Sequence, residues 1–159
     1  MDDLERLLIA EQRQVDDLIR LYQGPDFNPH LVINHGWDAH DVLAHLVSWH
    51  ESFALNMALL ARGEPPQPPR GTLADVNRDG VLRLRGQSIL QLNRRMRKAQ
   101  RTIEAHIRDE SIGLIPYRKP GTSYTRVQHL DVVRGHIHGH FWELVDFYVK
   151  ASQHAGPVG

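Results

Sequence analysis

Four long segments of this chain place apolar residues at spacings of three, four and seven, which is the period of one helix face. The first segment, Leu4–Tyr22, stops at Gly24-Pro25, where glycine and proline end a helix. The second, Asp41–Leu60, follows Asp38 as a candidate N-cap and stops at Arg62-Gly63. The first third of the sequence therefore predicts two long helices.

The rest of the chain continues this pattern. A third helical region covers Thr72–His106, with a break near Gly86 and a new N-cap at Ser88. The last helix covers Asp131–Lys150. Between the second and third regions lies the proline-rich stretch Glu64–Gly71, which we expect to run as extended polyproline II.

Almost no alternating, strand-like pattern occurs, so the sequence predicts an all-α fold. Four amphipathic helices in 159 residues favour one four-helix bundle, with the proline-rich stretch as a long crossover between helices two and three. We expect a single domain over residues 1–151 and a flexible C-terminal tail over residues 152–159.

Composition excludes several classes of protein. The chain has no cysteine, which excludes disulfides, thiolate zinc sites and a cysteine nucleophile. Its 19 basic and 19 acidic residues balance, so no overall field attracts nucleic acid or membrane. The acidic N-terminus is unlike a signal peptide, and no apolar run approaches ~18 residues. We expect a cytoplasmic protein.

His136 and His140 lie one helical turn apart in the last predicted helix. Residues at this spacing share a helix face, so two imidazoles can bind one divalent ion. The pattern alone is weak evidence, because the chain has 11 histidines and chance gives on the order of one such pair. On a helical wheel both rings flank Ile137 at the edge of the apolar stripe, whereas His138 faces away.

His45 lies at the edge of the apolar stripe of the second helix, next to Leu46. If these helices pack together, His45, His136 and His140 can form an open three-histidine site of the catalytic type. Imidazole binds zinc, nickel and iron, and the sequence does not choose among them. Half-buried histidines at the edge of the core explain the same spacing equally well.

Several motifs resemble the DinB-like superfamily. The run Gly36–Leu46, with sequence GWDAHDVLAHL, is similar to the second-helix signature of that superfamily. Further features resemble its ClbS/DfsB branch: Trp49, the RGEPP turn at Arg62–Pro66, the DVNR start of helix three at Asp75–Arg78, and the spacing of His136 and His140. The resemblance extends from about Leu4 to Val149.

The resemblance implies a four-helix bundle, often dimeric, in which a histidine triad binds a divalent metal. Carried across by motif, the ligands are His45, His136 and His140. It also implies a small electrophilic substrate, thiol transferase or hydrolase chemistry with a low-molecular-weight thiol, and a role in detoxification or self-resistance. The catalytic residues remain unknown.

Other interpretations stay open. A non-catalytic bundle that sequesters a small molecule without a metal fits the same sequence. A basic stripe, comprising Arg94, Arg97, Lys98 and Arg101, allows nucleic-acid binding, although a solvated helix face is the simpler interpretation. Three tryptophans, at positions 37, 49 and 142, are expected in the core or along a pocket.

Overall fold

Five helices and four short strands follow one another in the part of the chain that this computed structural model describes, residues 1–34 and 36–155. In chain order they are α1 (Asp3–Gln23), β1 (Val32–Asn34), β2 (Trp37–Asp38), α2 (Ala39–Ala61), α3 (Leu73–Leu84), α4 (Ile89–His106), β3 (Ile115–Pro116), β4 (Ser123–Tyr124) and α5 (Arg126–Ala155).

The predicted helix ends are present. Asp38 forms a capping box with Asp41 at the start of α2, and Ser88 forms one with Gln91 at the start of α4. Gly63, just past the end of α2, has φ +72°, a conformation that glycine adopts without steric cost. α5 continues to Ala155, so residues 152–155 of the expected tail are helical and residues 156–159 lie outside the described chain.

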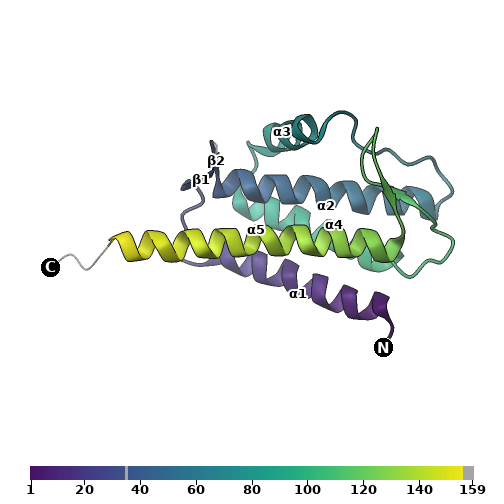
Figure 1. The fold of residues 1–159 in the computed structure, drawn as a ribbon, viewed down its shortest axis with the longest axis horizontal. Helices are drawn as coiled ribbons and strands as arrows, with labels where there is room; N and C mark the ends of the chain where they lie inside the picture. The colour runs from purple at the N-terminus through teal and green to yellow at the C-terminus, as the bar shows by residue number, and fades with distance from the viewer. Residues whose placement is uncertain (35, 156–159) are drawn as a thin grey trace.

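Four long helices pack around one apolar core. α2 packs along α4 and α1 along α5, and smaller contacts between α2 and α5 and between α1 and α4 close the ring (Figure 1). The C-terminal end of α5 extends past the other helices. The largest fully buried side chains include Leu8, Leu18, Ile19, Leu43, Phe53, Met57, Leu92, Met96 and Ile103.

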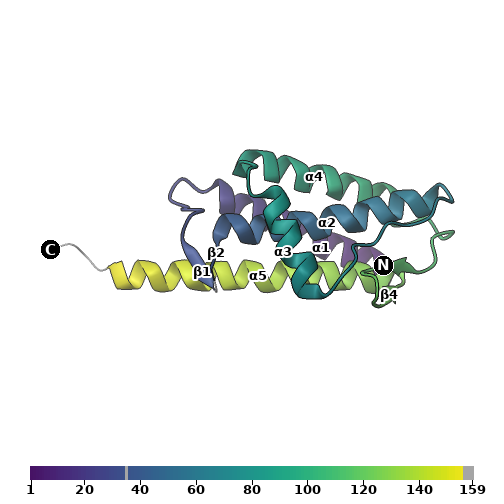
Figure 2. The ribbon, with the colours of Figure 1, turned by 90° about the horizontal axis from the view of Figure 1, so that it is seen from above.

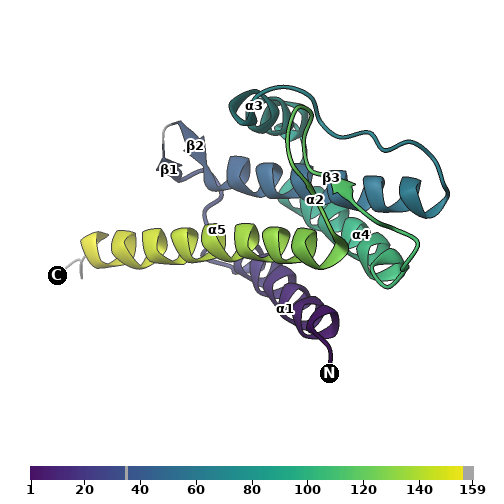
Figure 3. The same cartoon turned by 45° about the vertical axis from the view of Figure 1, so that its right-hand side comes forward.

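α3 lies on the outer side of α2 and crosses it, as Figures 2 and 3 show. The two helices approach closely at Gly80, where an added Cβ would lie 2.5 Å from Oγ and 2.9 Å from Cβ of Ser48. The proline-rich crossover before α3 is held by the stretch after α4, because the Lys119 amide donates to Pro69 and the Gly71 amide donates to Lys119.

Replacing Gly80 by alanine is expected to destabilise the protein. Overpacking costs about 1–3 kcal/mol, and the better helix propensity of alanine returns only about 1 kcal/mol. Gly135→Ala in α5 is the matched control, because its added Cβ meets no other part of the described chain within 4 Å, apart from its chain neighbours and the backbone of its own helix. The control should gain up to about 1 kcal/mol. Urea denaturation measures both free energies of unfolding, and equal values would contradict the close packing of α3 on α2.

The helical prediction is confirmed for most of the described chain, with five helices because the region Thr72–His106 divides into α3 and α4. The prediction of an all-α fold leaves out two small sheets, whose strands are two or three residues long. β1 pairs with β2, and β3 with β4, each as a two-stranded antiparallel sheet. Among the described residues, no helix is long and apolar enough to cross a bilayer.

Candidate metal centre

The three predicted histidines come together at the contact between α2 and α5. His45 is buried at 4% exposure on α2, and His136 and His140 lie one turn apart on α5. Nε2 of His45 lies 2.9 Å from Nε2 of His136. One ligand nitrogen from each of the three rings lies within 4.8 Å of the other two. The three rings are therefore close enough to bind a single ion.

The spacing fits a divalent metal. Two nitrogen ligands of a tetrahedral zinc ion, each at 2.0–2.1 Å, lie about 3.3 Å apart. The 2.9 Å between the rings of His45 and His136 differs from that by only a few tenths of an ångström. The ring planes meet at steep angles, 88° for this pair and 80° for His45 and His140, so the rings converge instead of stacking.

Two of these rings are held in the form that binds metal. Burial lowers the pKa of His45 to about 3, helped by the neighbouring rings of His136 and His140. Burial likewise lowers the pKa of His136 to about 4, with a further contribution from His140. Both imidazoles are neutral at pH 7, and only a neutral imidazole has a lone pair for a metal.

Two further residues adjoin the cluster. Nδ1 of His140 lies 3.4 Å from Oε1 of Glu143, which leaves Nε2 of that ring for an ion. Metal-binding histidines commonly donate their second nitrogen to a carboxylate in this way. The ring of Trp37 lies 5.1 Å from the ring of His45 and covers it from β2. The i, i+3 spacing of His140 and Glu143 is the signal in the sequence that could have identified Glu143.

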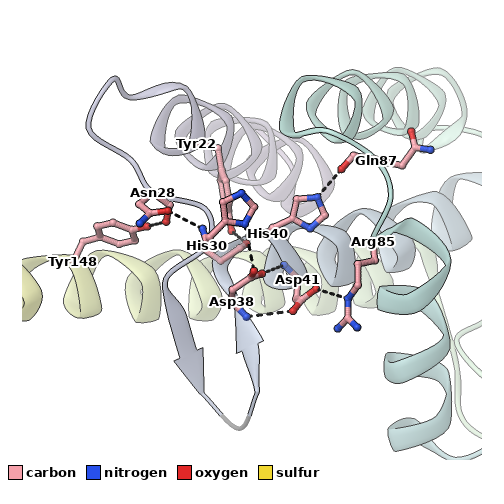
Figure 4. A network of polar contacts seen from close by, with 10 residues as sticks. Tyr22, Asn28, His30, Asp38, His40, Asp41, Arg85, Gln87 and Tyr148 are labelled. Atoms are coloured by element: carbon pink, nitrogen blue, oxygen red, sulfur yellow. Dashed lines mark hydrogen bonds and ion pairs between the residues drawn. The ribbon is translucent and has the colours of Figure 1, made fainter.

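Figure 4 shows a polar network that ties Asp38, the residue after Trp37 in β2, to the start of α2. The capping box joins Asp38 to Asp41, and Nε of Arg85 donates to Asp41 at 3.2 Å. Nε2 of His40 lies 2.6 Å from the carbonyl oxygen of Gln87. These contacts connect α2 with the junction of α3 and α4.

Asp38, His40 and Asp41 form a second compact group of potential ligands. The capping box, Arg85 and the Gln87 carbonyl already engage their polar atoms, so we interpret the group as structural. An open groove of about 680 Å³ lies beside it, lined also by His30 and by residues 85–89 and 91. None of the three clustered histidines lines this groove.

Other residues singled out by the sequence lie apart from the cluster. His138 is exposed, with Nδ1 3.0 Å from Gln14, and so faces away as expected. Trp49 is buried, but Trp142 is 54% exposed, so a core position for Trp142 is wrong. The four members of the basic stripe are exposed, and Arg97 pairs with Asp16 at 2.9 Å.

A further group of polar side chains, not anticipated from the sequence, is buried among the four long helices. The carboxyl of Glu11 is fully buried, and burial raises its pKa to about 8 against the lowering effect of the hydrogen bond from Gln100. His50 is 1% exposed, and burial lowers its pKa to about 4. Nε2 of His50 lies 2.7 Å from Oε1 of Gln100 and 3.4 Å from Oε1 of Glu11.

Comparison of the chain with protein-family models, with curated proteins and with solved structures finds no match in any of the three. The interpretation of the site therefore depends on its own geometry.

Proposed function

We propose that this chain is a DinB-like four-helix bundle protein of the ClbS/DfsB kind that binds one divalent metal ion through His45, His136 and His140. The observation that supports the proposal best is the convergence of three ring nitrogens within 4.8 Å from two separate helices. The packing of the four long helices around one core and the long crossover before α3 agree with such a bundle.

The chemistry of the donors suits this role. Three imidazole ligands are the pattern of a catalytic site, because structural zinc sites usually have four protein ligands. When bound, such an ion supplies Lewis acidity, which activates a water molecule or a thiol as a nucleophile. The chain contributes three fixed imidazoles, the Glu143 carboxylate behind His140 and the Trp37 ring over His45.

The remaining parts of the proposal concern the substrate and the assembly. We propose a small electrophilic substrate, attacked by water or by a low-molecular-weight thiol, in detoxification or self-resistance. We further propose a cytoplasmic homodimer without a nucleic-acid or membrane partner. Zinc, nickel and iron are all acceptable ions for three imidazoles.

Metal analysis tests the central claim. Protein purified without a histidine tag, stripped with chelator and incubated with zinc, nickel or iron(II) salts should retain about one ion per chain after desalting. Plasma mass spectrometry measures the stoichiometry, and calorimetry measures the affinity. Protein that stays metal-free with all three salts would exclude the proposal.

The groove beside Asp38 and Asp41 favours one alternative, a bundle that binds a small molecule without a metal. Its volume of about 680 Å³ falls in the range of small-molecule sites, roughly 300–1,000 Å³. That alternative predicts a rise in the melting temperature of the chelated protein with a ligand and no conversion of that ligand. Turnover that requires metal would favour the first proposal.

A further inference from the structure

The groove of about 680 Å³ beside Asp38 is formed by the start of α2, the segment before it and the junction of α3 and α4. Its charged residues are Asp38, Asp41 and Arg85. Arg85 already pairs with Asp41, because its Nε lies 3.2 Å from Oδ1 of that carboxylate. Within the described chain, the carboxylate of Asp38 is therefore the one charge in the groove wall without a fixed opposite charge.

The two carboxylate oxygens of Asp38 have different surroundings. Oδ1 accepts the N-cap hydrogen bond from the Asp41 amide at 2.8 Å. Oδ2 lies 3.7 Å from Nδ1 of His30, which is too long for a hydrogen bond, and the His30 side chain is 77% exposed. The side chain of Asp38 is itself 25% exposed and lines the groove. Oδ2 is therefore an anionic acceptor that a ligand in the groove can reach.

His40 adds a second acceptor to the same wall. The residue is 8% exposed and lines the groove. Its Nε2 lies 2.6 Å from the carbonyl oxygen of Gln87, and a carbonyl oxygen only accepts, so Nε2 carries the hydrogen of the neutral ring. Nδ1 is then a lone pair, and no described residue donates to it. One ligand atom from each of Asp38, His40 and Asp41 lies within 4.8 Å of the other two (Figure 4).

These acceptors favour a cation that donates hydrogen bonds. Hydrogen bonds from a charged donor to a carboxylate are stronger than neutral ones, and an ammonium group has three N–H donors. A metal ion suits the groove less well. Both oxygens of Asp41 are engaged, by Arg85 and by the Asp38 amide, so two acceptors remain where a metal site offers three or four protein ligands.

We propose that this groove binds a small primary amine in its protonated form, with the ammonium group on Oδ2 of Asp38 and Nδ1 of His40. The rest of the molecule lies along the groove wall, where Pro29 and Ile89 supply apolar surface. None of the three clustered histidines lines the groove. The amine site goes beyond the proposed metal function and does not depend on whether the cluster binds an ion.

A nuclear magnetic resonance titration of the metal-free, ¹⁵N-labelled protein at pH 7.5 tests the ligand class with three probes of related shape. Benzylamine has a positive charge and N–H donors, benzyltrimethylammonium has the charge alone, and benzyl alcohol is neutral. Benzylamine should shift the amide signals of Gly86 and Gln87 saturably, and the other two probes should bind at least tenfold more weakly. Equal affinities, or no saturable shift with benzylamine, would overturn the proposal.

Asp38→Asn tests the carboxylate. Asparagine caps a helix as well as aspartate does, so the variant keeps the cap of α2 and loses only the charge. Its affinity for benzylamine should fall at least tenfold. Asp2→Asn is the matched control, because Asp2 caps α1 through the Glu5 amide at 2.8 Å and does not line the groove. It should bind benzylamine like the wild type.

Circular dichroism verifies that both variants are folded. Equal affinity of folded Asp38→Asn and wild type for benzylamine would overturn the proposal. A crystal structure of the wild type with benzylamine should place the amino nitrogen within hydrogen-bonding distance of Asp38 and His40, and a different location would also overturn it. All these measurements use metal-free protein, so a failure to bind zinc would contradict the proposed function and leave the amine site intact.

Discussion

Lowering the pH of the metal-free protein from 6.5 towards 4.5 is expected to remove most of its stability. Burial holds the pKa values of four histidines below the usual 6.5: about 3 for His45 and His129, and about 4 for His50 and His136. Between those values and 6.5 the unfolded chain binds protons that the folded chain does not. The contribution of these four histidines to the free energy of unfolding is therefore complete above pH 6.5 and is lost as the pH falls below it.

Glu11 acts in the opposite direction, because its pKa rises from 4.5 to about 8 on folding. Its contribution is complete below pH 4.5 and is lost as the pH rises through 8. Between pH 4.5 and 6.5 it offsets about one of the four histidines. The net of about three protons corresponds to about 4 kcal/mol per pH unit, against a typical total stability of 5–15 kcal/mol.

Urea denaturation in chelator between pH 4.5 and 8.5 measures this profile. Wild type should be most stable near pH 7 and lose stability on both sides. Glu11→Gln should lose the alkaline decline, so its free energy of unfolding should rise relative to wild type between pH 6.5 and 8.5. A denaturation midpoint that stays constant from pH 6.5 to 5 would contradict neutral, buried histidines.

Replacing His136 by alanine is expected to weaken zinc binding by at least about 100-fold, since loss of a mere outer-shell partner already costs 10–100-fold. The variant removes the ring whose Nε2 lies 2.9 Å from that of His45, so two imidazoles remain. Isothermal titration calorimetry with zinc measures the change in affinity.

His138→Ala is the matched control for this measurement. His138 lies on the same helix, two residues from either ligand, but is exposed and contacts Gln14 instead of the cluster. Its zinc affinity should equal that of the wild type. Equal affinity for His136→Ala and His138→Ala would show that zinc binds elsewhere.

The helices and the cluster were largely predictable because they depend on periodic patterns. Wheel positions at the edge of two apolar stripes selected His45, His136 and His140, and packing of α2 against α5 brings them together. Asp38 and Ser88 were predictable as N-caps because capping is a local interaction between residues three apart.

Features that depend on distant residues or on very short elements were not predictable. Glu11 and Gln100 lie 89 residues apart, and an acid on an amphipathic helix normally faces solvent. The strands of β3 and β4 are two residues long, too short to show a period. Trp142 fits a helical spacing but is 54% exposed.

The arrangement of the helices gives the cluster a mechanical consequence. The most extensive packing joins α2 to α4 and α1 to α5, whereas the histidines bridge α2 and α5, which share a smaller contact. An ion held there would link the α2–α4 pair to the α1–α5 pair through the smaller contact between α2 and α5. A ligand of the native state suppresses opening of the parts that it joins. Amide hydrogen exchange at the α2–α5 contact should therefore report occupancy of the metal site more sensitively than global unfolding does.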